Sequence, residues 1–231
     1  MATSGTHAFN LDLGELIEEA YERTGSELRS GYSLKTARRS LNIMLLEWQN
    51  RGLNLWTVKE GAITLVAGTK SYTLDPERVD VIEAMMRLNA GDATRQTDYF
   101  MERISISSYS QLTNKLTTGR PTQFWVERAP EAITLHLWPV PDSTQTYTFQ
   151  YYYMERIEDS GQNVDTTVDI PSRYLPVLAS GLAYYLALKD PKAFSFITQL
   201  KAIYDEQWDI ASESHREKAS LRLVPAAPSF R

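Results

Sequence analysis

The 231-residue sequence contains no cysteine, only three histidines and no long apolar run. Without cysteine it has no disulfide framework, no thiol nucleophile and no zinc site that uses a thiolate. His7, His136 and His215 lie in unrelated contexts and form no HExxH pattern, so we expect no metal site. The first ten residues have neither a basic start nor an apolar core, and no stretch approaches the ~18 apolar residues of a membrane span. The sequence therefore predicts neither a signal peptide nor a membrane helix.

Basic residues are also fewer than acidic residues. Lys and Arg number 24 against 29 Asp and Glu, which gives a formal net charge of -5. Affinity for nucleic acid rests largely on cations that release the counterions of the phosphates. We therefore do not expect a protein that binds DNA tightly.

The motifs of common catalytic and nucleotide-binding sites are missing. Residues 68–71 resemble the end of a phosphate-binding loop, but Thr69 separates Gly68 from Lys70 and the pattern that follows is a strand. There is no GxSxG and no GxGxxG motif. Two carboxylates suffice for a glycosidase at any sequence separation, so a virion-associated cell-wall hydrolase stays an alternative. No residue receives a catalytic, cofactor-binding or metal-binding assignment, and we expect neither a cofactor nor enzyme activity.

Aromatic residues, by contrast, are plentiful, with thirteen Tyr and five Trp. They suit contact surfaces that have one dry and one wet end, or they fill a β-rich core. His136 alternates with Leu135 and Leu137, which favours a sheet-face residue with a hydrogen-bond partner over a ligand or a base. Trp138 fits a core position better than an interface anchor.

Two helices are predicted near the N-terminus. Apolar residues recur at helical spacing over residues 12–23, and the glutamates of that stretch form a solvated face. The second helix has Ser33 as its predicted N-cap and Gly52 at its end. Its apolar stripe consists of Leu34, Ala37, Leu41, Met44, Leu45 and Trp48.

The apolar period changes to two between residues 55 and 154, which indicates strands. Residues 63–65 and 72–74 flank a Gly68-Thr69-Lys70 turn and predict a β-hairpin. Further strands are predicted at 79–88, 123–127, 132–138 and 146–154, with a short helical insertion at 104–112. The strand at 146–154 is the clearest, because aromatic residues occupy every odd position from 147 to 153.

Helices return after residue 171 and are interrupted at Asp190-Pro191. Tyr174, Leu178, Leu182, Tyr185 and Leu186 mark the first, and Phe194, Ile197, Leu200, Tyr204, Trp208 and Ala211 mark the second. Beyond Lys218 the chain is apolar but too rich in proline for a helix, which indicates an extended arm.

The order of helix pair, β-block and helix pair predicts an α+β fold. The N- and C-terminal helices form one helical layer, and a central antiparallel β-rich layer projects from it. We divide the chain into N-terminal helices at 1–54, a β-rich layer at 55–157, C-terminal helices at 158–218 and an extended docking arm at 219–231.

Six motifs in order carry a resemblance that covers residues 34–225. They are Ala67-Gly68-Thr69-Lys70-Ser71-Tyr72-Thr73-Leu74, Gly119-Arg120-Pro121-Thr122, Leu137-Trp138-Pro139-Val140-Pro141-Asp142, Asp169-Ile170-Pro171-Ser172-Arg173-Tyr174, the helix from Tyr204-Asp205 to Trp208, and Arg216 to Pro225. In order and type they resemble the head-to-tail adaptors of short-tailed bacteriophages (podoviruses), also called tail accessory or packaged-DNA stabilisation proteins.

The resemblance implies a virion structural protein at the head-to-tail joint, assembled in the host cytoplasm. Such subunits form a homo-oligomeric ring, commonly of twelve, which docks on the portal protein, extends the DNA channel and provides the platform for the tail. Double-stranded DNA would pass through without specific binding, and an acidic channel wall would let it slide. No membrane partner is implied.

The same resemblance gives the arm a role. We expect Leu221, Leu223, Val224, Pro225 and Phe230 to dock on the portal or on a neighbouring subunit. Two alternatives remain. One is another head-tail connector or stopper protein with different stacking partners. The other is the cell-wall hydrolase that the carboxylates and aromatic residues leave open.

Overall fold

A computed structural model describes residues 11–26, 31–52, 55–161 and 167–213, together with residues 5, 9 and 163. These residues divide into two compact units. The helical unit comprises the described residues up to Met44 and from 163 onward, and the β unit comprises Leu45–Gly161. Helices and largely antiparallel sheets occur in separate parts of the chain, which confirms the predicted α+β class.

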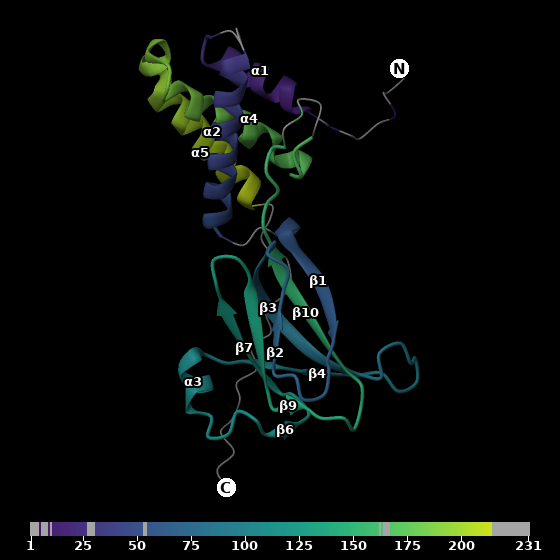
Figure 1. The fold of residues 1–231 in the computed structure, drawn as a ribbon. Helices are drawn as coiled ribbons and strands as arrows, with labels where there is room; N and C mark the ends of the chain where they lie inside the picture. The colour runs from purple at the N-terminus through teal and green to yellow at the C-terminus, as the bar shows by residue number, and fades with distance from the viewer. Residues whose placement is uncertain are drawn as a thin grey trace, which may run out of the picture. The chain divides into compact units, whose positions relative to one another are not determined.

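The helical unit contains α1 (Leu13–Arg23), α4 (Leu175–Ala187), α5 (Ile197–Glu213) and most of α2 (Gly31–Asn50), as Figure 1 shows. α1 begins as predicted: the Asp12 carboxylate accepts a hydrogen bond from the Glu15 N–H at 2.7 Å, and the Glu15 carboxylate accepts one from the Asp12 N–H. The predicted N-cap of α2 is wrong, because the helix begins at Gly31, two residues before Ser33. Neither Gly31 nor Tyr32 prevents a helical conformation, so the first turn of α2 includes residues on the N-terminal side of Ser33.

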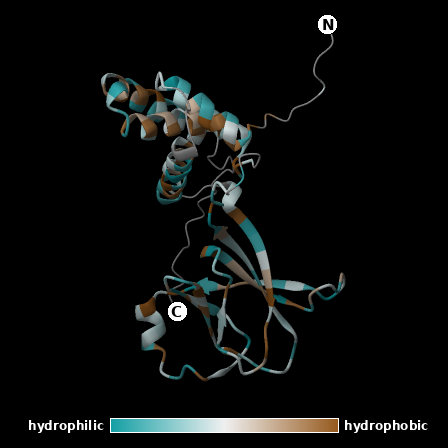
Figure 2. Ribbon diagram, turned by 45° about the horizontal axis from the view of Figure 1, so that its top comes forward, coloured by the Kyte–Doolittle hydropathy of each residue, from teal (hydrophilic) through white to brown (hydrophobic). Residues whose placement is uncertain are grey.

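α4 is the central helix of this unit. It is largely apolar and nine of its thirteen residues are buried, with α1 and α5 packed against it. A Cβ atom on Gly181 would lie 2.5 Å from the Met44 Sδ and 2.8 Å from the Tyr204 ring, so glycine lets α2 and α5 approach α4 closely. Figure 2 shows hydrophobic and hydrophilic residues alternating along the surrounding helices, as expected for amphipathic packing on a buried core helix.

The second C-terminal helix starts later than the apolar pattern predicts. Pro191–Phe196 forms a 3₁₀ helix capped by Asp190, and α5 follows at Ile197. A 3₁₀ helix has three residues per turn, so Phe194 falls outside the apolar face of α5 and is 73% exposed. Leu200, Tyr204 and Ala211 are buried, as predicted.

The β unit is built on two four-stranded sheets that face each other. The first has the order β1 (Val58–Thr64), β10 (Tyr147–Glu155), β3 (Arg78–Leu88), β4 (Thr97–Phe100), and all its pairs are antiparallel. The second has the order β2 (Ser71–Thr73), β8 (Ile133–Trp138), β7 (Gln123–Arg128), β5 (Glu102–Arg103), in which only the β5–β7 pair is parallel. β6 (Thr118–Gly119) and β9 (Val140–Pro141) form a small parallel pair, and α3 spans Ile106–Gln111 (Figure 1).

The core of the β unit lies between these sheets. The Phe124 and Phe149 rings, one from each sheet, meet edge to face with centroids 5.6 Å apart. The odd-numbered aromatic residues of β10 are buried in this core, which confirms the alternation that the sequence predicts.

The predicted hairpin around Gly68 is wrong. β1 pairs with β10 over seven residues, whereas β2 pairs with β8 in the other sheet. The turn therefore carries the chain from one sheet to the other. A three-residue partner could not satisfy the backbone of a seven-residue strand, and β10 can.

Candidate functional site

The five arm residues predicted to dock, Leu221, Leu223, Val224, Pro225 and Phe230, lie outside the described residues. His7 and His215 also lie outside them. The structure therefore does not place the predicted docking segment, and the candidate site has to be sought on the surfaces that the described residues expose.

His136 stands on the outer face of the second sheet as a packed residue. Its Nε2 lies 2.7 Å from Glu127 Oε2, its ring stacks on Trp125 at 4.7 Å between centroids, and Tyr109 of α3 packs against both rings. Burial and the charge of Glu127 raise the pKa of the Tyr109 hydroxyl. The predicted sheet-face role with a hydrogen-bond partner is confirmed.

Trp138 is half-buried on the same sheet. Its indole N–H donates to the carbonyl oxygen of Asn114 at 3.0 Å. The Tyr109 and Trp138 contacts tie the segment around α3 to the sheet, so this aromatic cluster is structural.

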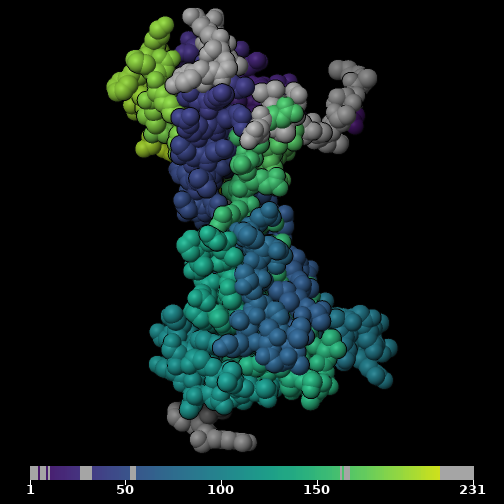
Figure 3. All heavy atoms as spheres, viewed as in Figure 1, coloured from purple at the N-terminus to yellow at the C-terminus, as the bar shows by residue number. Residues whose placement is uncertain are grey.

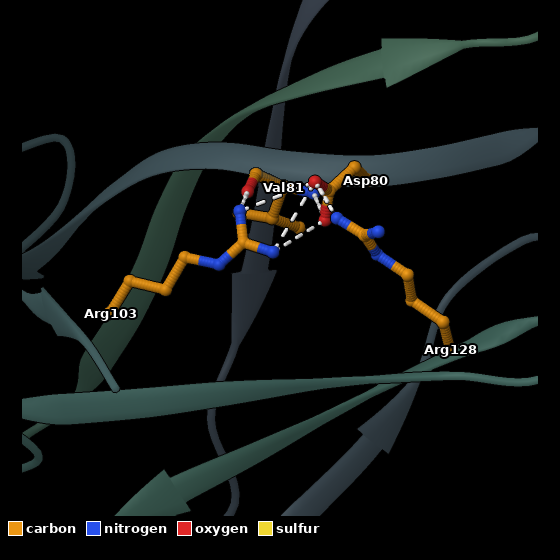
Figure 4. Close-up of polar contacts among 4 residues, drawn as sticks. All are labelled: Asp80, Val81, Arg103 and Arg128. Carbon is orange, nitrogen blue, oxygen red and sulfur yellow. Dashed lines mark hydrogen bonds and ion pairs between the residues drawn. The ribbon is translucent and has the colours of Figure 1, made fainter. Parts of the chain in front are cut away.

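A carboxylate shared by two arginines links the sheets of the β unit (Figure 4). Asp80 of β3 accepts from Arg103 of β5, at 2.9 Å, and from Arg128 of β7. Arg103 also donates to the Val81 carbonyl oxygen at 2.7 Å. Each charged group of this cluster has an internal partner, so the cluster stabilises the fold and presents no free charge to a ligand.

Neither a metal centre nor a membrane span emerges from the part of the chain that the structure describes. No group of three or more His, Asp and Glu residues is arranged to hold an ion there. No helix in that part is both long and apolar enough to cross a bilayer.

An apolar stripe runs along the outer face of the C-terminal helices. Phe196, Ile203 and Ile210 follow one another at intervals of seven residues, and they are 53%, 37% and 60% exposed. Residues seven apart lie on nearly the same face of a helix. Phe196 and Ile203 also border a cavity of about 440 Å³ together with Leu200 and Arg23. Apolar side chains gathered in this way on a surface are typical of an interaction site.

A second surface, the α1 groove, lies between α1 and the start of α4. It has a volume of about 470 Å³, with glutamates on one side and apolar residues on the other. Its lining consists of Leu11, Glu15, Glu18, Glu19, Glu22, Arg23, Leu175, Pro176 and Ala179.

Two of the groove's glutamates are occupied within the chain. Glu15 accepts from the Asp12 N–H, and Glu19 pairs with Arg23 at 2.7 Å. Glu18 and Glu22, one helical turn apart, have no side-chain partner among the described residues. The groove therefore presents two unpaired carboxylates next to an apolar wall.

A third surface, the α2 stripe, has the opposite charge. Lys35, Arg39, Ile43 and Leu46 are all exposed and follow one another at intervals of four, four and three residues, so they share one face of α2. In Figure 3 the atoms of α2, in dark blue, lie on the viewed face of the helical unit. Lys35 and Arg39 have no hydrogen-bond or ion-pair partner among the residues that the structure describes.

Positive charge at the α2 stripe is reinforced by Lys189. Its ammonium donates to Ser40 Oγ at 2.6 Å, and burial together with the nearby charge of Arg39 lowers its pKa. Arg39 and Lys189 therefore place two positive charges close together on this surface. This part of the surface thus favours an acidic partner.

The α1 groove could not be predicted from the sequence. The helical period correctly predicts an amphipathic helix at 12–23, but its four glutamates resemble an ordinary solvated face. The groove arises because Leu175, Pro176 and Ala179, more than 150 positions away in the chain, complete its apolar wall. Only the unusual density of glutamate on one helix was visible in the sequence.

The comparisons with known proteins decide the family. A family model described as SU10 adaptor protein matches residues 11–225 of the chain. The chain belongs to the SU10 adaptor protein family. A comparison with curated proteins found no significant match.

Membership of the SU10 adaptor family supports a phage adaptor, a structural component of the virion. The match includes both units and reaches into the arm, to residue 225. The coarse prediction of a phage structural adaptor is thereby confirmed. We accordingly expect the exposed surfaces of the protein, rather than an enclosed pocket, to carry its function.

Proposed function

We propose that this protein is the head-to-tail adaptor of a short-tailed phage: a ring of subunits, twelve in number, that docks on the portal and extends the DNA channel. The ring also provides the platform to which the tail attaches. The observation that carries the proposal is the family match over residues 11–225. The exposed apolar stripe of Phe196, Ile203 and Ile210 supports it, because apolar side chains gathered on a surface are typical of an interaction site.

The arm makes the contact with the portal. It follows α5 in the chain, and Ile203 and Ile210 of α5 form an exposed apolar stripe with Phe196, which precedes that helix. Burial of a large apolar side chain contributes about 1.5–3 kcal/mol before the cost of ordering is subtracted. Repetition around a ring turns a small contribution from each arm into stable attachment.

DNA passes through the ring without specific binding. The net charge of -5 on each chain is repeated by every copy, and a negative wall repels phosphates instead of holding them. A ring whose lumen is lined mainly by Lys and Arg would contradict this part of the proposal.

The test is to mix the purified chain with the portal ring of the same phage and to measure the mass of the complex. We expect saturation at a fixed ratio, with twelve chains per ring. A chain that stays monomeric and ignores the portal, or one that cleaves peptidoglycan in a zymogram, would overturn the proposal.

Removal of residues 221–231 isolates the role of the arm. We expect the truncated chain to keep its circular dichroism spectrum but to lose portal binding. Replacement of Leu221, Leu223, Val224 and Phe230 by serine should have the same effect, whereas the matched control Ser229→Ala should bind normally. Normal binding by the truncated chain would show that another surface docks on the portal.

A further inference from the structure

The surface features that the adaptor role leaves unassigned are the α1 groove and the α2 stripe. They lie on different helices, and they carry opposite charge. Glu18 and Glu22 of the groove, like Lys35 and Arg39 of the stripe, lack partners among the described residues. The carboxylates of one chain can therefore form ion pairs with the Lys35 and Arg39 side chains of another chain.

We propose that the α1 groove of one copy receives the α2 stripe of a neighbouring copy, so that the two helices lie side by side and antiparallel. This inference rests on the proposed function, because it assigns the contact between successive subunits of the ring.

The spacing of the two charged pairs supports the match. Glu18 and Glu22 are four residues apart, as are Lys35 and Arg39. Each interval corresponds to a rise of about 6 Å along its helix. Antiparallel helices therefore place Glu22 opposite Lys35 and Glu18 opposite Arg39 in a single register.

The same register also matches the apolar residues. Four positions beyond Arg39 comes Ile43, and four positions before Glu18 comes Gly14, which has no side chain to fill the space. Leu46, three positions further along α2, then falls past the N-terminal end of α1, near the segment from which Leu11 lines the groove. The two intervals of four are thus shared by both helices. A parallel alignment would instead bring Ile43 opposite Ser26, past the C-terminal end of α1.

The proposed contact joins two different surfaces, so it is heterologous. Such contacts repeat from one copy to the next and close into a ring when the rotation between copies permits. The occupant is therefore a second copy of this chain, presented through α2. The chain's own arm and a separate acidic or basic protein are the competing occupants that the test must exclude.

Charge reversal tests the pairing directly. Glu18→Lys/Glu22→Lys should reduce ring assembly on the portal at least tenfold, and Lys35→Glu/Arg39→Glu should do the same. An equimolar mixture of the two variants should assemble again, because each reversed groove then meets a reversed stripe. This recovery also shows that both variants are folded.

The matched control is Glu206→Lys/Asp209→Lys. These exposed residues of α5 change the net charge equally but lie outside the proposed contact, so the control should assemble like the wild type. Equal loss in the control would assign the effect to net charge and overturn the inference.

The absence of cysteine permits a test of register. Chains carrying Glu22→Cys and chains carrying Lys35→Cys, mixed and oxidised in the assembled state, should form a cross-linked dimer. The pair Glu22→Cys with Ile43→Cys should not, because its positions are displaced by about 12 Å along the helix and a disulfide requires closely spaced Cα atoms. Cross-linking of Glu22→Cys to Leu223→Cys instead would identify the arm as occupant and contradict the proposal.

The outcomes separate this inference from the adaptor role. If the wild-type chain forms rings and both reversed variants form them equally well, the helical contact is wrong while the adaptor ring stands. A wild-type chain that forms no ring on the portal would remove the proposed function itself. A closed pair of copies, seen as a dimer mass, would exclude the head-to-tail arrangement.

Discussion

The two units of this protein treat their charges differently. In the β unit several charged side chains form ion pairs that join strands: Asp80 with Arg103 and Arg128, Arg87 with Asp98 at 2.8 Å, and Lys59 with Glu155. In the described helical unit, Glu19 and Arg23 form such a pair, whereas Glu18, Glu22, Lys35 and Arg39 do not. The ion pairs of the β unit are thus internal and join its strands, whereas the charged surfaces of α1 and α2 keep carboxylates and cations without a partner among the described residues.

The difference indicates a division of labour. Internal pairs fix the register of strands and link sheets, which serves a rigid scaffold. Unpaired charges next to exposed apolar residues serve recognition, because they select the orientation of a partner while apolar burial supplies affinity. We therefore assign self-assembly to the helical unit and stability to the core of the β unit.

The substitution with the largest expected effect on stability lies in the core of the β unit and should destabilise that unit alone. Phe124→Ala removes the ring that meets Phe149 between the sheets and should lower the free energy of unfolding by about 3–5 kcal/mol. Phe100→Ala, in the same unit but 73% exposed, should change it by less than about 0.5 kcal/mol. Denaturant unfolding measures both. Hydrogen exchange read by peptide should locate the loss in residues 55–161, and equal loss throughout the helices would show that the units are not separate.

A second substitution should destabilise the helical unit and leave the β unit intact. Gly181→Val places a side chain where Met44 and Tyr204 already lie, and we expect a loss of roughly 1–3 kcal/mol or more from overpacking. Ala202→Val, on an exposed position of α5, should cost about 0.5 kcal/mol or less. Hydrogen exchange should now rise in α2, α4 and α5. A variant as stable as the wild type would refute the close approach at Gly181.

The shared carboxylate of Asp80 should contribute less. Asp80→Asn leaves two arginines without their common acceptor and should cost about 1–3 kcal/mol. Glu83→Gln on the same strand, where the side chain is exposed, is the matched control and should be nearly neutral. Thermal unfolding compares the two, and equal melting temperatures would mean that Asp80 is not a link between the sheets.

The smallest expected effect is a pH dependence of the Arg87–Asp98 pair. The hydrogen bond from Arg87 lowers the pKa of the Asp98 carboxyl below its ordinary value of 3.8. The pair's contribution is therefore fully present above that value and is lost as the pH falls through the lower pKa of the folded state. Asp98→Asn should cost less than about 1 kcal/mol at neutral pH, and the difference from wild type should shrink in acid. A difference that stays constant down to pH 2 would contradict the assignment.

Most of the fold could be predicted from the sequence, because its signals are local. The helical period at 12–23 and the alternation at 146–154 each follow from side chains that face one core. The absence of a hairpin at Gly68 could not be predicted from such local signals. A turn signal specifies a change of direction, whereas the choice of β10 as the partner of β1 depends on strands nearly a hundred residues away. The division of the chain at residues 54, 157 and 218 stays a prediction.

The candidate site could be predicted from the sequence less well than the fold. The six motifs led to the adaptor family, which the match over 11–225 confirms. The arm is inferred from a sequence that is apolar but too rich in proline for a helix, and its docking stays a prediction. The α1 groove could not be predicted, since Glu18 and Glu22 look like any solvated helix face until Leu175 and Pro176 close the other side.

The most direct test of the account is an electron cryomicroscopy structure of the chain assembled on its portal. The account predicts a closed ring in which α2 of every copy lies in the α1 groove of the next, with Glu22 beside Lys35. A ring held together by the β units, with Glu18 and Glu22 facing solvent in every copy, would contradict it.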